Sequence, residues 1–275
     1  MTIVAPAGYG KTTLLAQAEA ADPRPFAWVA LEDGDNDPVV LMTHLAEALD
    51  RITKVGPGVF DALRLPASSL WSKSVPRLGA ALASIERPAV VVLDDVHVLR
   101  ERDSLDVLAA ISGYLPRGSQ LMLAGREESQ LRLARLRTER LVAELGRDEL
   151  AFDAVEAGSL LRAAGVDLAE PHITTLTRRT EGWAAGLYLT ALSLRTGGTV
   201  DLDLLSAGAG PDNYIADYLR LEVLSRMAPE QVEFLTRISV LERICGQLCD
   251  AVLEQAGSAA MLEALAQTNH FLVAL

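Results

Sequence analysis

The residues best suited to chemistry lie near the start of the chain, in the run Ala5-Pro6-Ala7-Gly8-Tyr9-Gly10-Lys11-Thr12-Thr13. Glycines in such a turn let successive backbone amides point into one concavity, and the helix that begins there adds partial positive charge. Such a loop is suited to binding phosphate, and we expect Lys11 to reach the β- and γ-phosphates and the Thr12 hydroxyl to ligate Mg²⁺. Ala5 stands where the usual G-x-x-x-x-G-K-[ST] pattern has its first glycine. A glycine turn that merely joins a strand to a helix is the plainer alternative.

Two acidic residues follow a second hydrophobic run. Val90-Val91-Val92-Leu93 ends in Asp94 and Asp95, and ligands of open α/β sheets bind at the carboxyl ends of the strands. A phosphate loop needs a carboxylate from a second strand to hold the Mg²⁺ that bridges the phosphates. We expect Asp94 to contact the metal or its water, and Asp95 to orient or deprotonate the attacking water. The alternative is a strand that simply ends in an acidic turn.

Arg126 is the third candidate, because it follows a hydrophobic strand predicted near residues 120–124. If that strand lies beside the Asp94 strand, the guanidinium reaches the γ-phosphate and reports whether it is present. A solvated arginine near a strand end is an equal alternative. Trp183, flanked by Gly182 and Gly186, is interpreted as a core anchor of a helical region rather than as a base-stacking residue.

The elements that must position these residues alternate between strand and helix over residues 1–150, as a parallel α/β sheet requires. The expected strands cover residues 2–4, 26–31, 89–93, 120–124 and 141–145, and the expected helices cover 14–21, 38–51 and 75–85. Asp37 is placed to cap the second helix, which Pro38 opens. Residues 52–74 carry Gly, Pro and Ser and are expected to be irregular. Four arginines between Arg132 and Arg140 indicate a solvated helical face.

From Ala154 onward the periodicity is helical. The expected helices cover residues 155–164, 170–179, 183–194, 214–227, 229–238, 247–255 and 259–268, and a closing strand is expected at 271–275. The interval 196–212 is rich in glycine and is interpreted as a linker between two helical groups.

Composition narrows the class of protein. Half of the 275 residues are hydrophobic, and the formal net charge is −12 with a pI near 4.8. Such a charge repels a phosphate backbone, so we expect no direct nucleic-acid binding by this chain. Cys245 and Cys249 lack the further ligands of a metal site and are interpreted as core residues of a reducing, cytoplasmic protein. No run is long enough for a membrane span, and the first residues lack the layout of a signal peptide.

Ordered segments spread over nearly the whole chain carry a family resemblance. They are the loop 5–13, Trp28-Val29-Ala30-Leu31 before Asp35-Asn36-Asp37-Pro38, Leu93-Asp94-Asp95 with His97, Gly125-Arg126, Leu133-Ala134-Arg135-Leu136-Arg137, Leu150-Ala151-Phe152 with Glu156, the segment 180–187, Asp217-Tyr218-Leu219 with Glu222-Val223-Leu224, Val240-Leu241-Glu242-Arg243 with Leu248-Cys249-Asp250, and Asn269-His270-Phe271-Leu272-Val273. Together they resemble the ATPase module of the large ATP-binding LuxR-type transcriptional regulators, the relatives of the maltose-regulon activator, within the STAND class of signal-transduction ATPases.

The resemblance implies an α/β fold in which a P-loop NTPase parallel sheet is followed by a helical domain and a partial winged-helix domain. The implied domains are a P-loop nucleotide-binding domain at 1–150, a helical lid at 151–212 and an incomplete winged-helix-like domain at 213–275. Two departures stand out: the chain begins almost at the loop, without the family's adenine-enclosing segment, and it lacks the family's sensor repeats and helix-turn-helix. We therefore expect a fragment or a truncated protein, whose DNA contact belongs to a missing C-terminal domain.

The implied function is a switch that binds ATP or ADP with Mg²⁺. ATP favours an open, self-associating state, and slow hydrolysis to ADP restores the closed one. Two other functions stay open. One is a degenerate, nucleotide-free interaction scaffold, which fits the absent N-terminal segment. The other is a metabolic P-loop phosphotransferase, which needs a substrate pocket that the sequence does not reveal.

Overall fold

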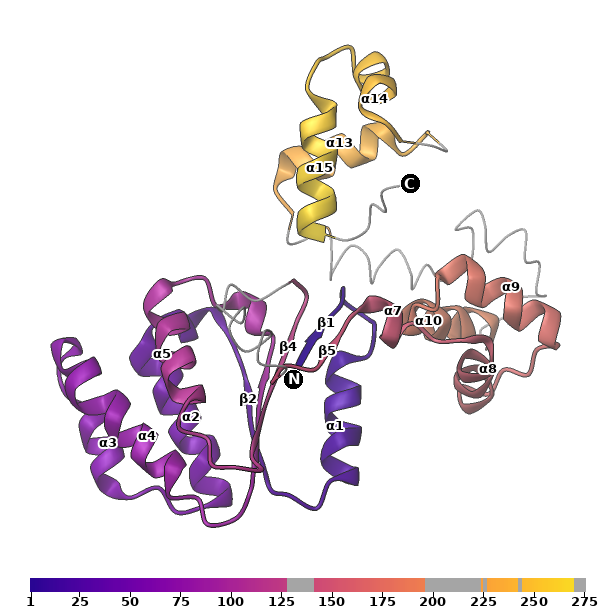
Figure 1. The fold of residues 1–275 in the computed structure, drawn as a ribbon. Helices are drawn as coiled ribbons and strands as arrows, with labels where there is room; N and C mark the ends of the chain where they lie inside the picture. The colour runs from indigo at the N-terminus through magenta and orange to yellow at the C-terminus, as the bar shows by residue number, and fades with distance from the viewer. Residues whose placement is uncertain (128–140, 196–223, 225–226, 242–243, 270–275) are drawn as a thin grey trace. The chain divides into compact units, whose positions relative to one another are not determined.

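The chain divides into two compact units in the computed structural model, which describes residues 1–127, 141–195, 224, 227–241 and 244–269 (Figure 1). The first unit comprises Met1–Ala5 and Gly10–Leu150, and the second comprises Pro6–Tyr9 and Ala151–Leu275. Four residues of the glycine loop therefore group with the second unit, although the residues on both sides of them group with the first.

A five-stranded parallel sheet forms the centre of the first unit. Its strands are β1 (Thr2–Val4), β2 (Phe26–Ala30), β3 (Val90–Asp94), β4 (Gln120–Gly125) and β5 (Glu144–Leu145), in the order β2-β3-β4-β1-β5. The strand before Arg126 pairs with the strand that ends in Asp94, as predicted. Val4 pairs with Gly125, so the loop after β1 and Arg126 after β4 leave the sheet at the same edge.

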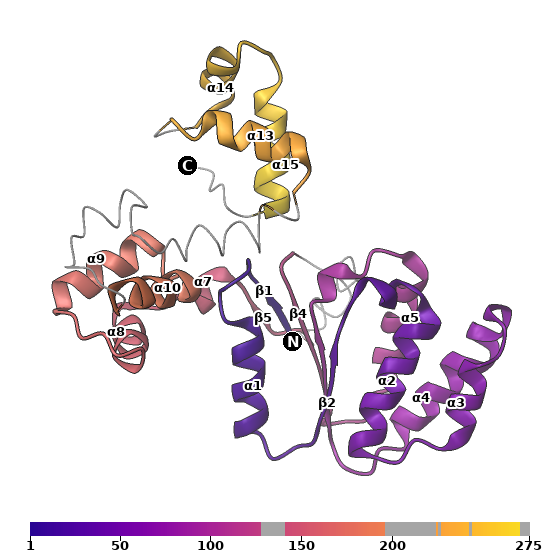
Figure 2. The same cartoon turned by 180° about the vertical axis from the view of Figure 1, so that it is seen from behind.

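Alternate residues of β2, β3 and β4 enter two different cores, because successive side chains of a strand point to opposite faces. In β3, Val91 and Leu93 join one cluster, while Val90 and Val92 join the other. Helix α1 (Lys11–Ala21) covers the second face through Leu15. The other face is covered by α2 (Pro38–Ile52), α3 (Pro57–Leu63), α4 (Val75–Ala83) and α5 (Arg102–Ser112), as Figures 1 and 2 show.

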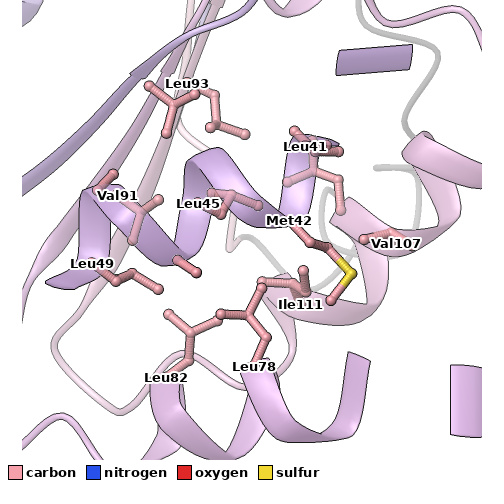
Figure 3. Close-up of a cluster of buried hydrophobic side chains, with 14 of the residues drawn as sticks. Leu41, Met42, Leu45, Leu49, Leu78, Leu82, Val91, Leu93, Val107 and Ile111 are labelled. Carbon is pink, nitrogen blue, oxygen red and sulfur yellow. The ribbon is translucent and has the colours of Figure 1, made fainter. Parts of the chain in front are cut away.

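The larger core lies between β3 and the helices α2, α4 and α5 (Figure 3). Burying one such aliphatic side chain contributes about 1.5–3 kcal/mol relative to leaving it exposed. The side chains seen together in this core are Leu41, Met42, Leu45, Leu49, Leu78, Leu82, Val91, Leu93, Val107 and Ile111.

The start of α2 agrees with the prediction. Asp37 caps the helix by accepting a hydrogen bond of 2.7 Å from the backbone N–H of Val39 and one of 3.4 Å from that of Val40. Pro38 occupies the first turn, where its missing N–H costs nothing.

The expectation of an irregular segment at residues 52–74 is wrong. This segment contains α3, a 3₁₀ turn at Ala67–Ser69 and a π-helical turn at Leu70–Ser74. Its glycine and proline mark a helix start, since Pro57 stands in the first turn of α3. Val59, Leu63 and Leu70 are buried in the large core, so tertiary packing overrides the composition. Helix α5 was not expected either.

The second unit contains helices with two separate buried clusters. Helices α8 (Ala154–Ala163), α9 (Glu170–Thr180) and α10 (Ala184–Arg195) pack through residues that include Leu161, Ile173, Leu176, Leu187 and Ala191. Helices α13 (Pro229–Ile238), α14 (Gly246–Leu253) and α15 (Ser258–Asn269) pack through Phe234, Ile238, Cys249, Leu253 and Leu265.

Several expected elements lie outside the described residues: the arginine-bearing piece over 132–140, nearly all of the helix at 214–227 and the closing strand at 271–275. The two cysteines have different environments. Cys249 is buried, as predicted, but Cys245 is exposed. Cys245 precedes α14 as its extended N-cap residue, so it lies outside the buried face of the helix. Within the described part of the chain, no helix is both long and apolar enough to cross a membrane.

Candidate phosphate-binding site

The loop between β1 and α1 has the backbone conformation that the glycines predict. Gly8 and Gly10 have φ angles of 81° and 79°, in the left-handed region where residues other than glycine are strained. Gly10 is the N-cap of α1, and its carbonyl accepts the first helical hydrogen bond from Leu14 at 2.8 Å. Ala5 has no positive φ, so an alanine fits at this position without backbone strain.

Lys11 is buried at the start of α1, and its Nζ donates a 2.7 Å hydrogen bond to the carbonyl of Ala5. The pKa of Lys11 is lowered to about 8, chiefly by burial and then by the positive charge of Arg126, while the charges of Asp95 and Asp94 act in the opposite direction. Arg126, Asp94 and Asp95 therefore lie close enough to Lys11 to affect its protonation. A buried lysine of this kind favours a multivalent anion, whose negative charge would stabilise the protonated form.

Thr12 and Asp94 form the hydroxyl-carboxylate pair that a magnesium site needs. The Thr12 hydroxyl donates a 2.6 Å hydrogen bond to Oδ2 of Asp94, although 82 positions separate the two residues. Mg²⁺ in nucleotide sites is held by one or two protein oxygens plus the phosphates, not by a full protein cage. Among the described residues, no group of three or more His, Cys, Asp or Glu side chains has the arrangement to hold a metal. The pair fits Mg²⁺ in company with phosphate.

Asp95 stands at the turn after β3 with a φ of 58°, a left-handed conformation. Its N–H donates a 2.9 Å hydrogen bond to Oδ1 of Asp94, so the turn also orients the Asp94 carboxylate. Oδ1 of Asp95 lies 3.7 Å from Nδ1 of His97, in the 3₁₀ turn Val96–Val98. The Asp95 side chain is half-exposed, so it faces water while Asp94 is buried.

The other predicted site residues lie at the same sheet edge or in the loop. Arg126 directly follows β4 and is partly buried. Thr13 is exposed in the first turn of α1, where no described contact ties it to the site. Pro6, Ala7, Gly8 and Tyr9 group with the second unit, and Tyr9 is buried there.

The interpretation of Trp183 as a core anchor is wrong. Trp183 is only partly buried, and its indole Nε1 donates a 2.9 Å hydrogen bond to the carbonyl of Ala7 in the glycine loop. The two flanking glycines were the available signal. They allow close approach, but the sequence does not say which backbone the indole approaches.

Sequence reasoning also assigned no role to Asn36. Its Nδ2 donates to the carbonyl of Val98 at 2.9 Å, and its Oδ1 accepts from the N–H groups of Arg100 at 2.8 Å and Glu101 at 3.0 Å. Asn36 therefore holds the segment that follows the Asp94 and Asp95 turn. The turn-forming Asp35-Asn36-Asp37 run was visible in the sequence, but its distant partners were not.

The fold and the glycine loop together indicate the class of protein domain. A parallel sheet with the order β2-β3-β4-β1-β5, a glycine loop between β1 and α1, and an aspartate at the end of β3 are the features of a P-loop NTPase domain. Comparison of the sequence with known families adds a second result. Residues 220–275 match the family model described as the MalT winged helix domain.

Two kinds of named protein are similar to almost the entire chain. It is 34% identical over 98% of its length to the serine/threonine-protein kinase PknK of Mycobacterium tuberculosis H37Rv, of which it covers 25%. It is 29% identical over 98% of its length to the HTH-type transcriptional regulator MalT of Vibrio campbellii, of which it covers 30%. MalT of Yersinia enterocolitica is 32% identical over 86% of this chain, which covers 26% of that regulator.

These matches confirm the resemblance to MalT-type regulators. The chain spans less than a third of the length of each of these relatives. Among solved structures, a RuvB variant from Thermotoga maritima covers 98% of this chain at 14% identity with a TM-score of 0.45, and 77% of that chain is covered. The Aeropyrum pernix Orc1 protein in complex with DNA covers 100% at 16% identity with a TM-score of 0.44, and 73% of that chain is covered. Both similarities are distant.

Proposed function

We propose that this chain is the nucleotide-dependent switch module of a MalT-like regulator, and that it binds ATP or ADP with Mg²⁺ through the loop 5–13. The observation that carries the proposal is the hydrogen bond between Thr12 and Asp94, beside a buried Lys11. A loop that merely connected a strand to a helix would have no need to bury a lysine whose pKa falls to about 8. Bound Mg²⁺ would supply charge neutralisation between the phosphates, held by Thr12 and Asp94.

In this proposal, three side chains of the protein have separate roles. Lys11 binds the β- and γ-phosphates, Asp95 orients the attacking water, and Arg126 senses the γ-phosphate. The half-exposed position of Asp95 gives water access to its carboxylate, whereas Asp94 is buried and bound to Thr12. Hydrolysis in this scheme is slow and serves to reset the switch, and the ATP state self-associates.

The matches favour a regulatory module over a metabolic enzyme. The same stretch is similar to a protein named as a kinase and to proteins named as transcriptional regulators, so what they share here fits a common control function. Contact with DNA, in this proposal, belongs to parts of the regulator outside these residues, consistent with the net charge of −12. The module would act in the cytoplasm, where ATP is available.

The test is nucleotide binding by the intact chain, measured by calorimetry with ATP, ADP and GTP in the presence of Mg²⁺. Lys11→Ala is the key variant. Lys54→Ala is its matched control, because Lys54 loses the same charge from a side chain that is 92% exposed. We expect adenine nucleotide binding by the wild type and Lys54→Ala, and at least a tenfold loss for Lys11→Ala, equivalent to about 1.4 kcal/mol.

Two further measurements separate the alternatives. Equal nucleotide binding by the wild type and Lys11→Ala, or none by either, would favour the interaction scaffold. Rapid phosphoryl transfer from ATP to a small acceptor would favour the phosphotransferase. Sedimentation velocity with ATP, ADP and no nucleotide tests self-association, and an unchanged sedimentation coefficient in all three would contradict that part of the proposal.

A further inference from the structure

Two hydrogen bonds within the second unit reach the glycine loop from the start of α10. The indole Nε1 of Trp183 donates to the carbonyl of Ala7 at 2.9 Å. The backbone N–H of Ala185 donates to the carbonyl of Gly8 at 3.0 Å. Both bonds lie within the unit formed by Pro6–Tyr9 and Ala151–Leu275. They join residues 176 and 177 positions apart in the chain.

A fixed carbonyl also fixes a neighbouring amide. The peptide unit is planar and trans, so the carbonyl of one residue and the N–H of the next point in opposite directions. The described residues contain no cis peptide bond. The donor from Trp183 thus sets the direction of the Gly8 N–H, and the donor from Ala185 sets that of the Tyr9 N–H. These two amides belong to the set that a phosphate loop turns toward its anion.

The indole itself is held in place by the glycines on both sides of it. A Cβ added to Gly186 would lie 2.3 Å from Cε3 of Trp183, so only glycine lets the indole pack against the first turn of α10. Gly182 has a φ of 69°, and an added Cβ would lie 2.5 Å from the carbonyl oxygen of Phe152. The Phe152 N–H donates a 2.9 Å hydrogen bond to the Gly182 carbonyl. Trp183 therefore projects from a closely packed backbone.

We propose that Trp183 and the backbone N–H of Ala185 are positioning groups for the phosphate loop, which hold the Gly8 and Tyr9 amides in the direction needed for phosphate. The inference rests on the proposed nucleotide binding and deepens it. A loop with two left-handed glycines loses much conformational entropy on ordering. Hydrogen bonds that order the loop beforehand raise its affinity for phosphate, because that cost is no longer met at binding.

The experiment compares Trp183→Phe with Trp71→Phe in the full chain. Phenylalanine keeps an aromatic ring and removes the indole N–H, while Trp71 is 49% exposed and serves as the matched control. Amide resonances of Gly8 and Tyr9 are followed by NMR without nucleotide, and Mg²⁺-ADP affinity is measured by calorimetry. We expect Trp183→Phe to shift both resonances and to weaken binding about two- to tenfold, the effect of one hydrogen bond. Trp71→Phe should do neither.

Ala185→Pro tests the second hydrogen bond without touching the indole. Proline in the first turn of a helix is tolerated; here it removes the N–H donor and places its ring Cδ against the Gly8 carbonyl, so the contact is broken. We expect the Tyr9 amide to shift more than that of Gly8. Thermal unfolding of each variant checks that it is folded.

Unshifted amides and an unchanged Mg²⁺-ADP affinity in folded Trp183→Phe and Ala185→Pro would overturn the inference. If the wild type binds no nucleotide, the proposed function fails. The NMR comparison, which needs no ligand, then decides whether Trp183 holds the loop.

Discussion

The hydroxyl of Thr12 and the carboxylate of Asp94 lie 2.6 Å apart, one at the start of α1 and the other at the end of β3. Each side chain comes from a rigid element, and the parallel order of the sheet brings both to the same edge. The distance between them is therefore set by the fold, not by a flexible loop.

Removing the Thr12 hydroxyl should weaken nucleotide binding only when Mg²⁺ is present. We expect Thr12→Val and Asp94→Asn to lower ATP affinity on the order of tenfold in Mg²⁺, about 1.4 kcal/mol, and to leave it unchanged in EDTA. Thr12→Ser keeps the hydroxyl and should bind like the wild type. Calorimetry under both conditions measures this, and a Thr12→Val protein that binds normally in Mg²⁺ would count against the metal assignment.

Replacing Lys11 with methionine should stabilise the nucleotide-free protein while abolishing nucleotide binding. The folded-state pKa of Lys11, about 8, lies below its ordinary value of 10.5. Between these two pH values the unfolded chain holds a proton that the folded chain has released, so this residue makes the free energy of unfolding rise with pH. Below pH 8 the buried charge destabilises the fold.

The size of this effect follows from the pKa difference. Lys11→Met should raise the free energy of unfolding by about 1–3 kcal/mol at roughly pH 7, and the gain should shrink as the pH approaches about 10. Thermal unfolding of wild type and variant across this pH range, without nucleotide or Mg²⁺, gives the difference. A gain that does not depend on pH would show that the lysine charge is not its cause.

Arg126→Gln should weaken ATP binding more than ADP binding. If the guanidinium contacts the γ-phosphate, ATP affinity should fall on the order of tenfold while ADP affinity stays the same. The pKa of Lys11 should rise, because the Arg126 charge is one cause of its lowering. Arg117→Gln, at an exposed position, is the control. An equal loss for both nucleotides would point to a general electrostatic role instead.

Asn36→Ala should loosen the segment that follows the acidic turn. The variant loses hydrogen bonds to Val98, Arg100 and Glu101, and should lower the free energy of unfolding by about 1–3 kcal/mol. Asn36→Asp keeps the acceptor and should lose less. Denaturant unfolding monitors stability, and hydrogen exchange of residues 96–101 monitors the segment. Equal exchange in Asn36→Ala and the wild type would show that other contacts hold it.

The parallel sheet and the residues at its edge could be predicted because local signals agreed with the fold. The run Val90-Val91-Val92-Leu93 is buried on both faces, and Asp37 caps α2 as its position indicated. Gly8 and Gly10 adopt the left-handed conformations that only glycine adopts freely. In these places a short window of sequence carries the physical cause of the structure.

The features that the sequence did not predict depend on contacts between residues far apart in the chain. The helix α3 depends on burial of Val59 and Leu63 against distant elements, which outweighs the glycine and proline around it. The Trp183 contact depends on a loop 176 positions away, and Asn36 on partners more than 60 positions away. Nothing in a local window specifies such partners.

Asp95 places a carboxylate where the main chain would prefer glycine. A left-handed φ of 58° disfavours any residue with a Cβ, although aspartate tolerates it better than most. The left-handed conformation of Asp95 therefore lowers the stability of the turn, and the turn places a carboxylate at the carboxyl-terminal edge of the sheet. Among variants at this position, a screen for heat tolerance should enrich glycine. If the chain hydrolyses ATP as proposed, a screen for phosphate release should retain the acid.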